Sequence, residues 1–290
     1  MTREELIHNI KEGEIIEKAD LSGMDLSGAD LSGGIFEEVR FQGANLSGAD
    51  LRESIFTKPT FSGADMTGAN MRSVIMTKAN LTGVVLKNAD MVEAKLTNAD
   101  LSGADLSGAD LSNAALISAT LKEADLSKTN LDHTVMHEAQ LQGINLSGAN
   151  LKQTIMMGSA LEGAVFTGAK FDLTMMLKVN LSKMDLSGMQ FTGVQFKGAD
   201  LSGVNLTGAD LTQASFMEAN LSEAVLDKVK AQYAIFMLAK MTNASLKGAF
   251  LKQTTFGEAD LTGADLSGAE LESSIFEKSV CKATRSPEPI

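Results

Sequence analysis

The chain has little of what secreted proteins and membrane proteins depend on. Its 290 residues include no Trp, one Tyr, three Pro and a single Cys, Cys281. One Cys cannot form an intrachain disulfide, which indicates a reducing compartment. No apolar run approaches the ~20 residues of a membrane helix, and the charged residues 1–13 lack the apolar core of a signal peptide. We expect a cytoplasmic protein, with export by a machine that needs no signal peptide as the open alternative.

Basic side chains are also scarce. Lys and Arg number 25 against 37 Asp and Glu, which gives a formal net charge of −12. Such a surface disfavours direct binding of nucleic acid or of anionic membranes. His133 and His137 have a spacing that brings metal ligands together on a helix but not on a β-coil. We expect no metal site, no cofactor and no paired acid and base, and therefore no enzyme.

What the sequence has in abundance is a repeat of five residues. An apolar residue recurs at every fifth position from Leu21 to Phe276, which gives 52 centres without an insertion or a deletion. All of them are Leu, Phe or Met except Ala231. The minus-two residue, two before each centre, is small, and the minus-one residue is usually Asp or Asn. A period of five fits neither a helix nor a flat strand, so each unit must bury its apolar residues against its neighbours.

This A(D/N)LxG pattern resembles that of the pentapeptide-repeat family over residues 19–278. The resemblance implies an all-β fold, a right-handed quadrilateral β-helix with four pentapeptides in each coil. The 52 repeats would then form about 13 coils. In that fold the centre and the minus-two side chains point inward, and the minus-one, plus-one and plus-two side chains point outward.

The residues outside the repeat predict two short flanking segments. Residues 1–18 are expected to form a helix from about Thr2 to Lys11, with Thr2 and Glu5 as a capping box and Gly13 at its end. This helix would cover the first coil, whose open strands would otherwise pair with other chains.

Residues 279–290 break the period and are expected to form a tail. Because no second cap helix follows the last coil, we expect that coil to be bare and to support a homodimer. The N-terminal TREEL segment that runs into ADLSG repeats also resembles the pentapeptide-repeat modules of bacterial type VI secretion loci.

The four sides of the predicted β-helix differ, because residues 20 apart stack on the same side. On one of them, the Ile/Met side, nine of the 13 minus-one residues are apolar. Apolar patches of this size mark interfaces, and Met adapts to different partners. Two structural alternatives remain: a stabilising ladder of β-branched residues, or a bent wall that half-buries them. The predicted interface comprises Ile35, Ile55, Ile75, Val135, Ile155, Met175, Met217, Ile235, Met237 and Ile275.

A rival prediction uses the acidic residues. Some members of the family mimic DNA and bind type II topoisomerases such as gyrase, and Asp-rich sides are the feature such a role would need. Duplex DNA carries one charge per ~1.7 Å, about three times the density available here, and Asp is also an ordinary choice for a solvated corner. The acidic candidates are Asp100, Asp105, Asp110, Asp125, Asp200, Asp210, Asp260 and Asp265.

Together these features predict a non-catalytic protein–protein interaction rod. It would bind an unidentified protein or a second copy of itself through the Ile/Met side. A type VI secretion adaptor or effector accessory is the more specific form of this prediction. The alternatives are a DNA-mimicking inhibitor or protector of gyrase, and a domain that only stabilises a larger complex.

Overall fold

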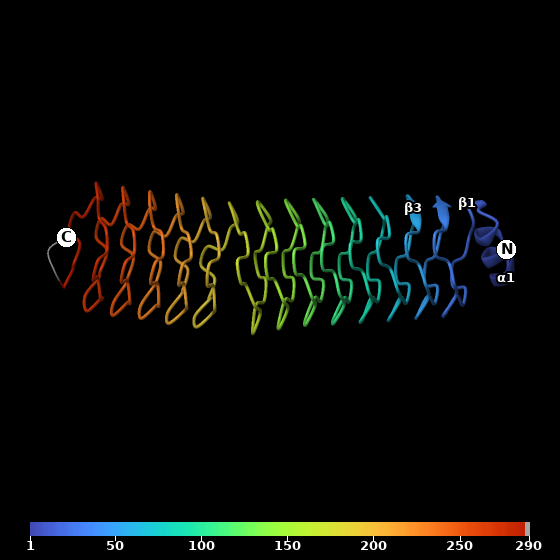
Figure 1. The fold of residues 1–290 in the computed structure, drawn as a ribbon, viewed down its shortest axis with the longest axis horizontal. Coiled ribbons are helices and arrows are strands. Elements are labelled where there is room, and N and C mark those ends of the chain that lie inside the picture. The colour runs from blue at the N-terminus through green and yellow to red at the C-terminus, as the bar shows by residue number, and fades with distance from the viewer. Residues whose placement is uncertain (288–290) are drawn as a thin grey trace. The chain divides into compact units, whose positions relative to one another are not determined.

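The computed structural model describes residues 1–287, which begin with helix α1 (Arg3–Lys11) beside the first coil (Figure 1). The predicted capping box is confirmed. The Glu5 N–H donates to the Thr2 hydroxyl at 3.2 Å, and the Thr2 N–H donates to the Glu5 carboxylate at 2.8 Å. These bonds satisfy amides that the first helical turn leaves without partners.

The end of α1 and its packing also follow from the sequence. Gly13 has a φ of 76° and donates to the carbonyl of Ile10, while Glu14 donates to Asn9. This pair of bonds is the Schellman motif that a glycine allows. Leu6 is fully buried, so α1 covers the coil beneath it as expected. Among residues 1–287, no helical segment has the length and apolar character needed to cross a bilayer.

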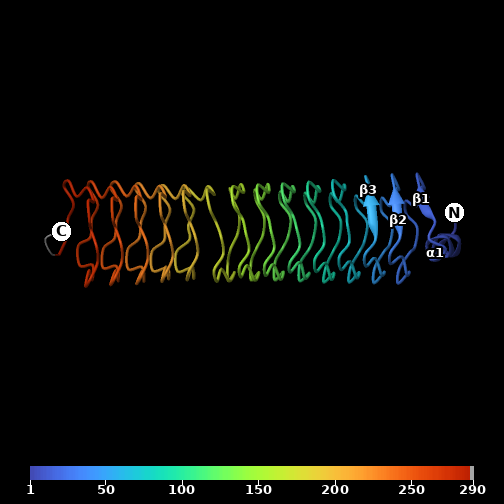
Figure 2. The same ribbon diagram turned by 45° about the horizontal axis from the view of Figure 1, so that its top comes forward.

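Parallel pairing between residues 20 apart builds the coils. Strands β1 (Ile15–Glu17), β2 (Ile35–Glu37) and β3 (Ile55–Thr57) form one parallel sheet (Figure 2). Elsewhere single-residue bridges recur every five residues, as at Asp100↔Thr120 and Asp105↔Asp125. Four such bridges for each 20 residues define four sides, which confirms the predicted β-helix.

The core consists of the centre and minus-two residues, as the pattern predicts. Leu106 and its minus-two neighbour Ala104 are almost completely buried. Phenylalanines at the centres stack face to face along one side: Phe36 and Phe56 lie 4.5 Å apart with 4° between their planes. Buried hydroxyls at minus-two positions donate to backbone carbonyls, as Thr134 does to Leu111 at 2.7 Å. The Thr134 hydroxyl is therefore paired although it lies inside the core.

Backbone bonds account for four of the five N–H groups in a typical pentapeptide. Asp105 donates to the preceding coil, and Leu106 and Gly108 donate to the following coil. Ala104 closes a turn within its own coil. The fifth N–H, that of Ser107, donates to the Asp105 carboxylate at 3.1 Å. An Asp or Asn at minus-one is therefore the side chain that satisfies the remaining amide of the turn.

Each corner has one residue of positive φ at plus-two, and most corners close with the hydrogen bond of a turn, as a type II turn does. Gly103 has a φ of 63° there, and Lys78 and Tyr233 have 61° and 60°. Glycine suits this conformation because it has no Cβ. Many corners carry a residue other than glycine at plus-two, and the stacked coils hold that residue in the same conformation.

The boundaries of the β-helix differ from those expected. Coil pairing begins at Ile15 rather than at residue 19, and bridges continue past residue 278 to Val280 and Arg285. The first part of the expected 279–290 tail therefore continues the coil, because the backbone can pair there without a Leu, Phe or Met centre. Residues 288–290 lie outside the described part of the chain.

The repeat is also divided between two compact units, where the unbroken period predicted one. The first unit comprises Met1–Ile155 with Ala160–Ala169, and the second comprises Met156–Ser159 with Lys170–Ile290. The five-residue period is the same on both sides of this division. Periodicity could not reveal the division, because it reports only the local alternation of buried and exposed positions.

Candidate interaction surface

In the first unit, the minus-one residues of the Ile/Met side form one parallel ladder. Ile15 pairs with Ile35, which pairs with Ile55 in strands β1 to β3, and the ladder continues through Ile75. Lys95 and Ala115 follow, and the ladder then reaches the last two apolar candidates of this unit, Val135 and Ile155.

These side chains fall into an exposed and a half-buried set. Ile15, Ile35 and Ile55 are 49%, 36% and 39% exposed. The remaining candidates of this unit are half-buried: Ile75, Val135 and Ile155. The exposed set therefore coincides with the three regular strands, where Ile rather than Asp or Asn occupies minus-one and β-branched residues favour extended backbone.

In the second unit, the corresponding surface is a shorter patch around one coil. Ile235 is half-buried, while Met237 and Leu238 in the same coil are exposed. Met217 lies on the adjacent coil, since the Glu218 N–H donates to the Met237 carbonyl. The other two candidates, Met175 and Ile275, are exposed and are separated from Ile235 in the ladder by polar residues.

The acidic candidates lie on different sides of the β-helix. Asp105 and Asp125 are paired in one ladder, but Asp100 pairs with Thr120 and Asp110 with Asn130. In the second unit Asp200 and Asp260 belong to one ladder, through Asn220 and Lys240, whereas Asp210 pairs with Lys230 and Asp265 with Arg285 in two others. Asp residues five apart in sequence thus lie on different sides, because each successive pentapeptide forms the next side of the coil.

These carboxylates also have a structural task. The Thr262 N–H donates to Asp260 at 3.0 Å, and the Ser267 N–H donates to Asp265 at 3.0 Å. The hydroxyl and the N–H of Thr262 lower the pKa of Asp260 below its ordinary value, and those of Ser267 do the same for Asp265. The charged form is thereby favoured at the turn.

No metal site emerges from the described part of the chain: residues 1–287 contain no group of three His, Cys, Asp or Glu side chains able to hold an ion. The His133 ring nitrogen lies 3.0 Å from the carboxylate of its neighbour Asp132, and His137 lies 3.5 Å from Glu138. His133 and His137 are therefore each placed beside a neighbouring acid on the surface.

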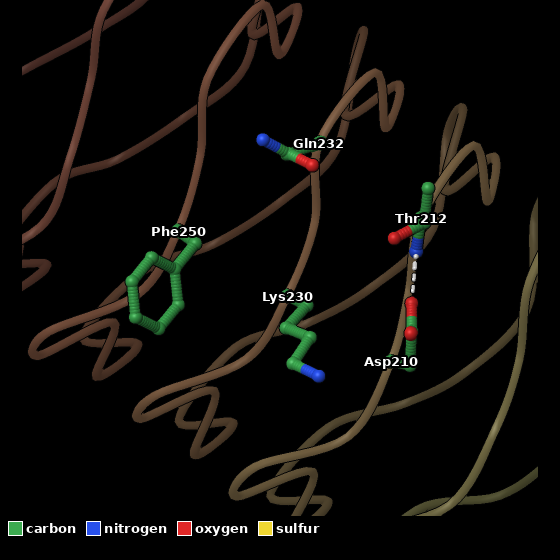
Figure 3. Close-up of a pocket in the computed structure, with 5 residues that line it drawn as sticks. All are labelled: Asp210, Thr212, Lys230, Gln232 and Phe250. Carbon is green, nitrogen blue, oxygen red and sulfur yellow. Dashed lines mark hydrogen bonds between the residues drawn. The ribbon is translucent and has the colours of Figure 1, made fainter.

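One feature of the second unit could not be predicted from the repeat. A shallow hollow of about 310 Å³ opens on a different side of this unit from the Ile/Met side. We call it the Phe250 hollow, after the apolar side chain among its lining residues. Its lining residues come from three successive coils (Figure 3): Asp210, Thr212, Lys230, Gln232 and Phe250. Phe250 stands at minus-one, where the repeat normally carries a polar residue, and this departure was the signal available in the sequence.

Comparison with known proteins identifies the family. A family model of pentapeptide repeats matches with 8 copies, over residues 35–72, 75–113, 109–148, 144–176, 178–208, 205–243 and 239–277. No curated protein matches the chain.

Three solved structures illustrate the likeness. HetL, a pentapeptide repeat protein involved in heterocyst differentiation regulation in the cyanobacterium Nostoc, is 26% identical over 99% of this chain and 98% of its own, with a TM-score of 0.22. A pentapeptide repeat protein of the Arabidopsis thaliana thylakoid lumen is 27% identical over 44% of this chain and 68% of its own, with a TM-score of 0.21. QnrB1, a plasmid-mediated fluoroquinolone resistance protein, is 18% identical over 88% and 90%, with a TM-score of 0.22.

The family model covers most of the chain, and the coils described above have the four-sided geometry that its repeats imply. The chain belongs to the pentapeptide-repeat family and folds as its right-handed quadrilateral β-helix.

Proposed function

We propose that this protein is a non-catalytic protein-interaction module that binds through the Ile/Met side. The observation that carries the proposal is the row formed by Ile15, Ile35 and Ile55. These three side chains stand in parallel register on β1, β2 and β3, and each is more than one third exposed. When a partner covers a regular apolar row on a solvent-facing sheet, the burial stabilises the complex by ~25 cal/mol for each Å² of apolar surface removed from water.

The patch of the second unit supports the same proposal. Met237 and Leu238 are 36% and 46% exposed and lie beside the half-buried Ile235. Flexible Met side chains let such a surface adapt to a partner. The partner is a protein, because a surface this open does not enclose a small molecule.

The test is photocrosslinking from the exposed row. A photoreactive amino acid replaces Ile35 in one sample and Thr60, a minus-one residue on another side of the first unit, in the control. Both samples are irradiated in a lysate of the source organism. We expect a crosslinked product of defined mass from position 35 alone, and we expect Ile15→Asp with Ile55→Asp to abolish it. Equal products from both positions would contradict the proposed face.

Self-association is the second form of the proposal. A second copy would dock on the exposed Ile row or on the last coil, where Val280 is exposed. Sedimentation at increasing protein concentration distinguishes the two sites. A dimer lost in Ile35→Asp assigns the Ile row, a dimer lost in Val280→Asp assigns the last coil, and a monomer at all concentrations excludes self-association.

The type VI secretion assignment rests on the N-terminal segment alone. Helix α1 and the first coils carry the TREEL and ADLSG segments on which that resemblance depends. We propose it as the specific setting of the module. Identification of the crosslinked partner as a component of such a secretion system would support it, and a partner outside the system would refute it.

The gyrase alternative has less support from the geometry. Its acidic residues face different sides, and Asp260 and Asp265 each accept a turn N–H. A supercoiling assay decides the question directly. Inhibition or protection of gyrase by the protein would favour this alternative over the Ile/Met side.

A further inference from the structure

The Phe250 hollow combines three side chains of different chemistry in one ladder. Asp210, Lys230 and Phe250 are minus-one residues of successive coils and pair in parallel register. Thr212 and Gln232 complete the lining, each two residues beyond a ladder residue (Figure 3). The hollow therefore presents an anion, a cation and an apolar ring in that order along one side of the second unit.

The two charged groups of this ladder keep binding capacity that the protein itself does not use. Within residues 1–287 Lys230 forms no ion pair, although Asp210 precedes it in the ladder. The equivalent pair Asp20 and Arg40, also 20 residues apart, is joined at 2.7 Å. One oxygen of Asp210 accepts the Thr212 N–H at 3.0 Å, which leaves the other oxygen for a ligand.

Phe250 supplies the apolar end. Its ring is 43% exposed, and exposure of so large an apolar side chain costs free energy that a bound ligand recovers. The exposed Gln232 offers both a donor and an acceptor at the rim.

We propose that the Phe250 hollow binds a small zwitterion that carries an apolar group, such as a free aromatic amino acid. Its carboxylate pairs with Lys230, its ammonium pairs with the free oxygen of Asp210, and its side chain packs on Phe250. A volume of about 310 Å³ lies at the lower end of ligand pockets, which suits a single amino acid.

The order of charges excludes simpler ligands. A lone anion attracted by Lys230 would be repelled by Asp210, and a lone cation attracted by Asp210 would be repelled by Lys230. A neutral sugar would leave both charges partly desolvated and unpaired, which is unfavourable. A ligand with both signs, in contrast, satisfies the two groups together.

The experiment is a titration of the isotope-labelled full chain followed by NMR, with L-phenylalanine as the probe. We expect saturable shifts of the amides around residues 210, 230 and 250. Three analogues test the three contacts: phenylacetate lacks the ammonium, phenethylamine lacks the carboxylate, and glycine lacks the ring. Phenylacetate and phenethylamine are each expected to bind ~10-fold or more weakly, the effect of losing one hydrogen bond to a charged group. Glycine is expected to bind ~10-fold or more weakly because it buries no apolar surface on Phe250.

Matched variants locate the site. Lys230→Met, Asp210→Asn and Phe250→Thr are each expected to weaken binding by a similar factor. Lys240→Met and Asp260→Asn make the same changes in another ladder of the second unit and are expected to leave binding unchanged. No shift at millimolar L-phenylalanine, or analogues that bind as tightly as L-phenylalanine, would overturn the proposal. The crosslinking test at Ile35 concerns the first unit, so either proposal can fail without the other.

Discussion

The side-chain amide of Asn45 donates to the Asp25 carboxylate of the preceding coil at 3.1 Å, directly across a parallel backbone bridge. Alternation of Asn and Asp along a ladder thus converts a potential repulsion between stacked acids into a hydrogen bond. Asn145 and Asp125 repeat this relationship at 3.0 Å.

Replacement of Asn45 by Asp should therefore destabilise the first unit. Two carboxylates would face each other across the bridge, and like charges at this position cost ~0.2–1 kcal/mol. Urea unfolding measures the loss, which should shrink at high salt because these exposed charges are screened. Asn45→Ser removes the bond without adding charge and should show no such salt dependence. A salt-independent loss in Asn45→Asp would contradict the explanation.

The Asp side chains at minus-one should contribute mainly as turn caps and to a smaller extent through their charge. Asp200 accepts the Ser202 N–H at 3.0 Å and the Asn220 amide at 3.1 Å. We expect Asp200→Ala to lower the free energy of unfolding by ~0.5–2 kcal/mol, as the loss of a helix cap does. Asp200→Asn keeps the oxygen acceptor and should be nearly neutral in the same unfolding assay. Equal losses in the two variants would show that charge, not capping, is responsible.

Acid should remove part of this contribution. The Ser187 hydroxyl and N–H, and to a smaller extent the Asn205 amide, lower the pKa of Asp185 below its ordinary value. Because the unfolded chain then binds the proton more tightly, the stabilisation is complete above about pH 4 and is lost as the pH falls through the folded pKa. An NMR titration of the Asp185 carboxyl carbon should show this lowered pKa. Ser187→Ala should raise it, and an unchanged value would refute the assigned cause.

The plus-two corners should tolerate Asn better than Ala. Gly103 has a φ of 63°, and a Cβ placed there would meet no atom within 4 Å. Any cost therefore comes from the left-handed backbone, which disfavours Ala by ~1–2 kcal/mol. We expect thermal unfolding to show a clear loss for Gly103→Ala and a smaller one for Gly103→Asn. Equal losses would indicate a steric cause.

Leucines of the same chain should differ according to their position in the pentapeptide. Leu201 is a fully buried centre, whereas Leu238 is a plus-two residue that is 46% exposed. Leu201→Ala should cost ~2–5 kcal/mol through the cavity it leaves. Leu238→Ala should change stability by less than ~0.5 kcal/mol while weakening partner binding. Chemical denaturation compares the two, and similar losses would contradict the inward and outward assignment.

Much of the fold could be predicted from residues alone, because the period carries the geometry. The spacing of Leu101 and Leu106 identified the buried positions, and Thr2 with Glu5 identified the start of α1. Each of these depends on neighbours within a few residues, so local sequence is sufficient. The stacking of Ile35 on Ile55 followed in the same way, since a period without insertions keeps residues 20 apart on one side.

The tertiary structure alone decided what depends on distance and exposure. It showed which isoleucines of the ladder are exposed, because burial of Ile75 and Ile155 depends on their neighbours in adjacent coils. It also divided the repeat into two units. It also brought Asp210, Lys230 and Phe250 together around one hollow. Their spacing of 20 residues predicts a shared side, but whether their side chains leave a hollow depends on how successive coils pack.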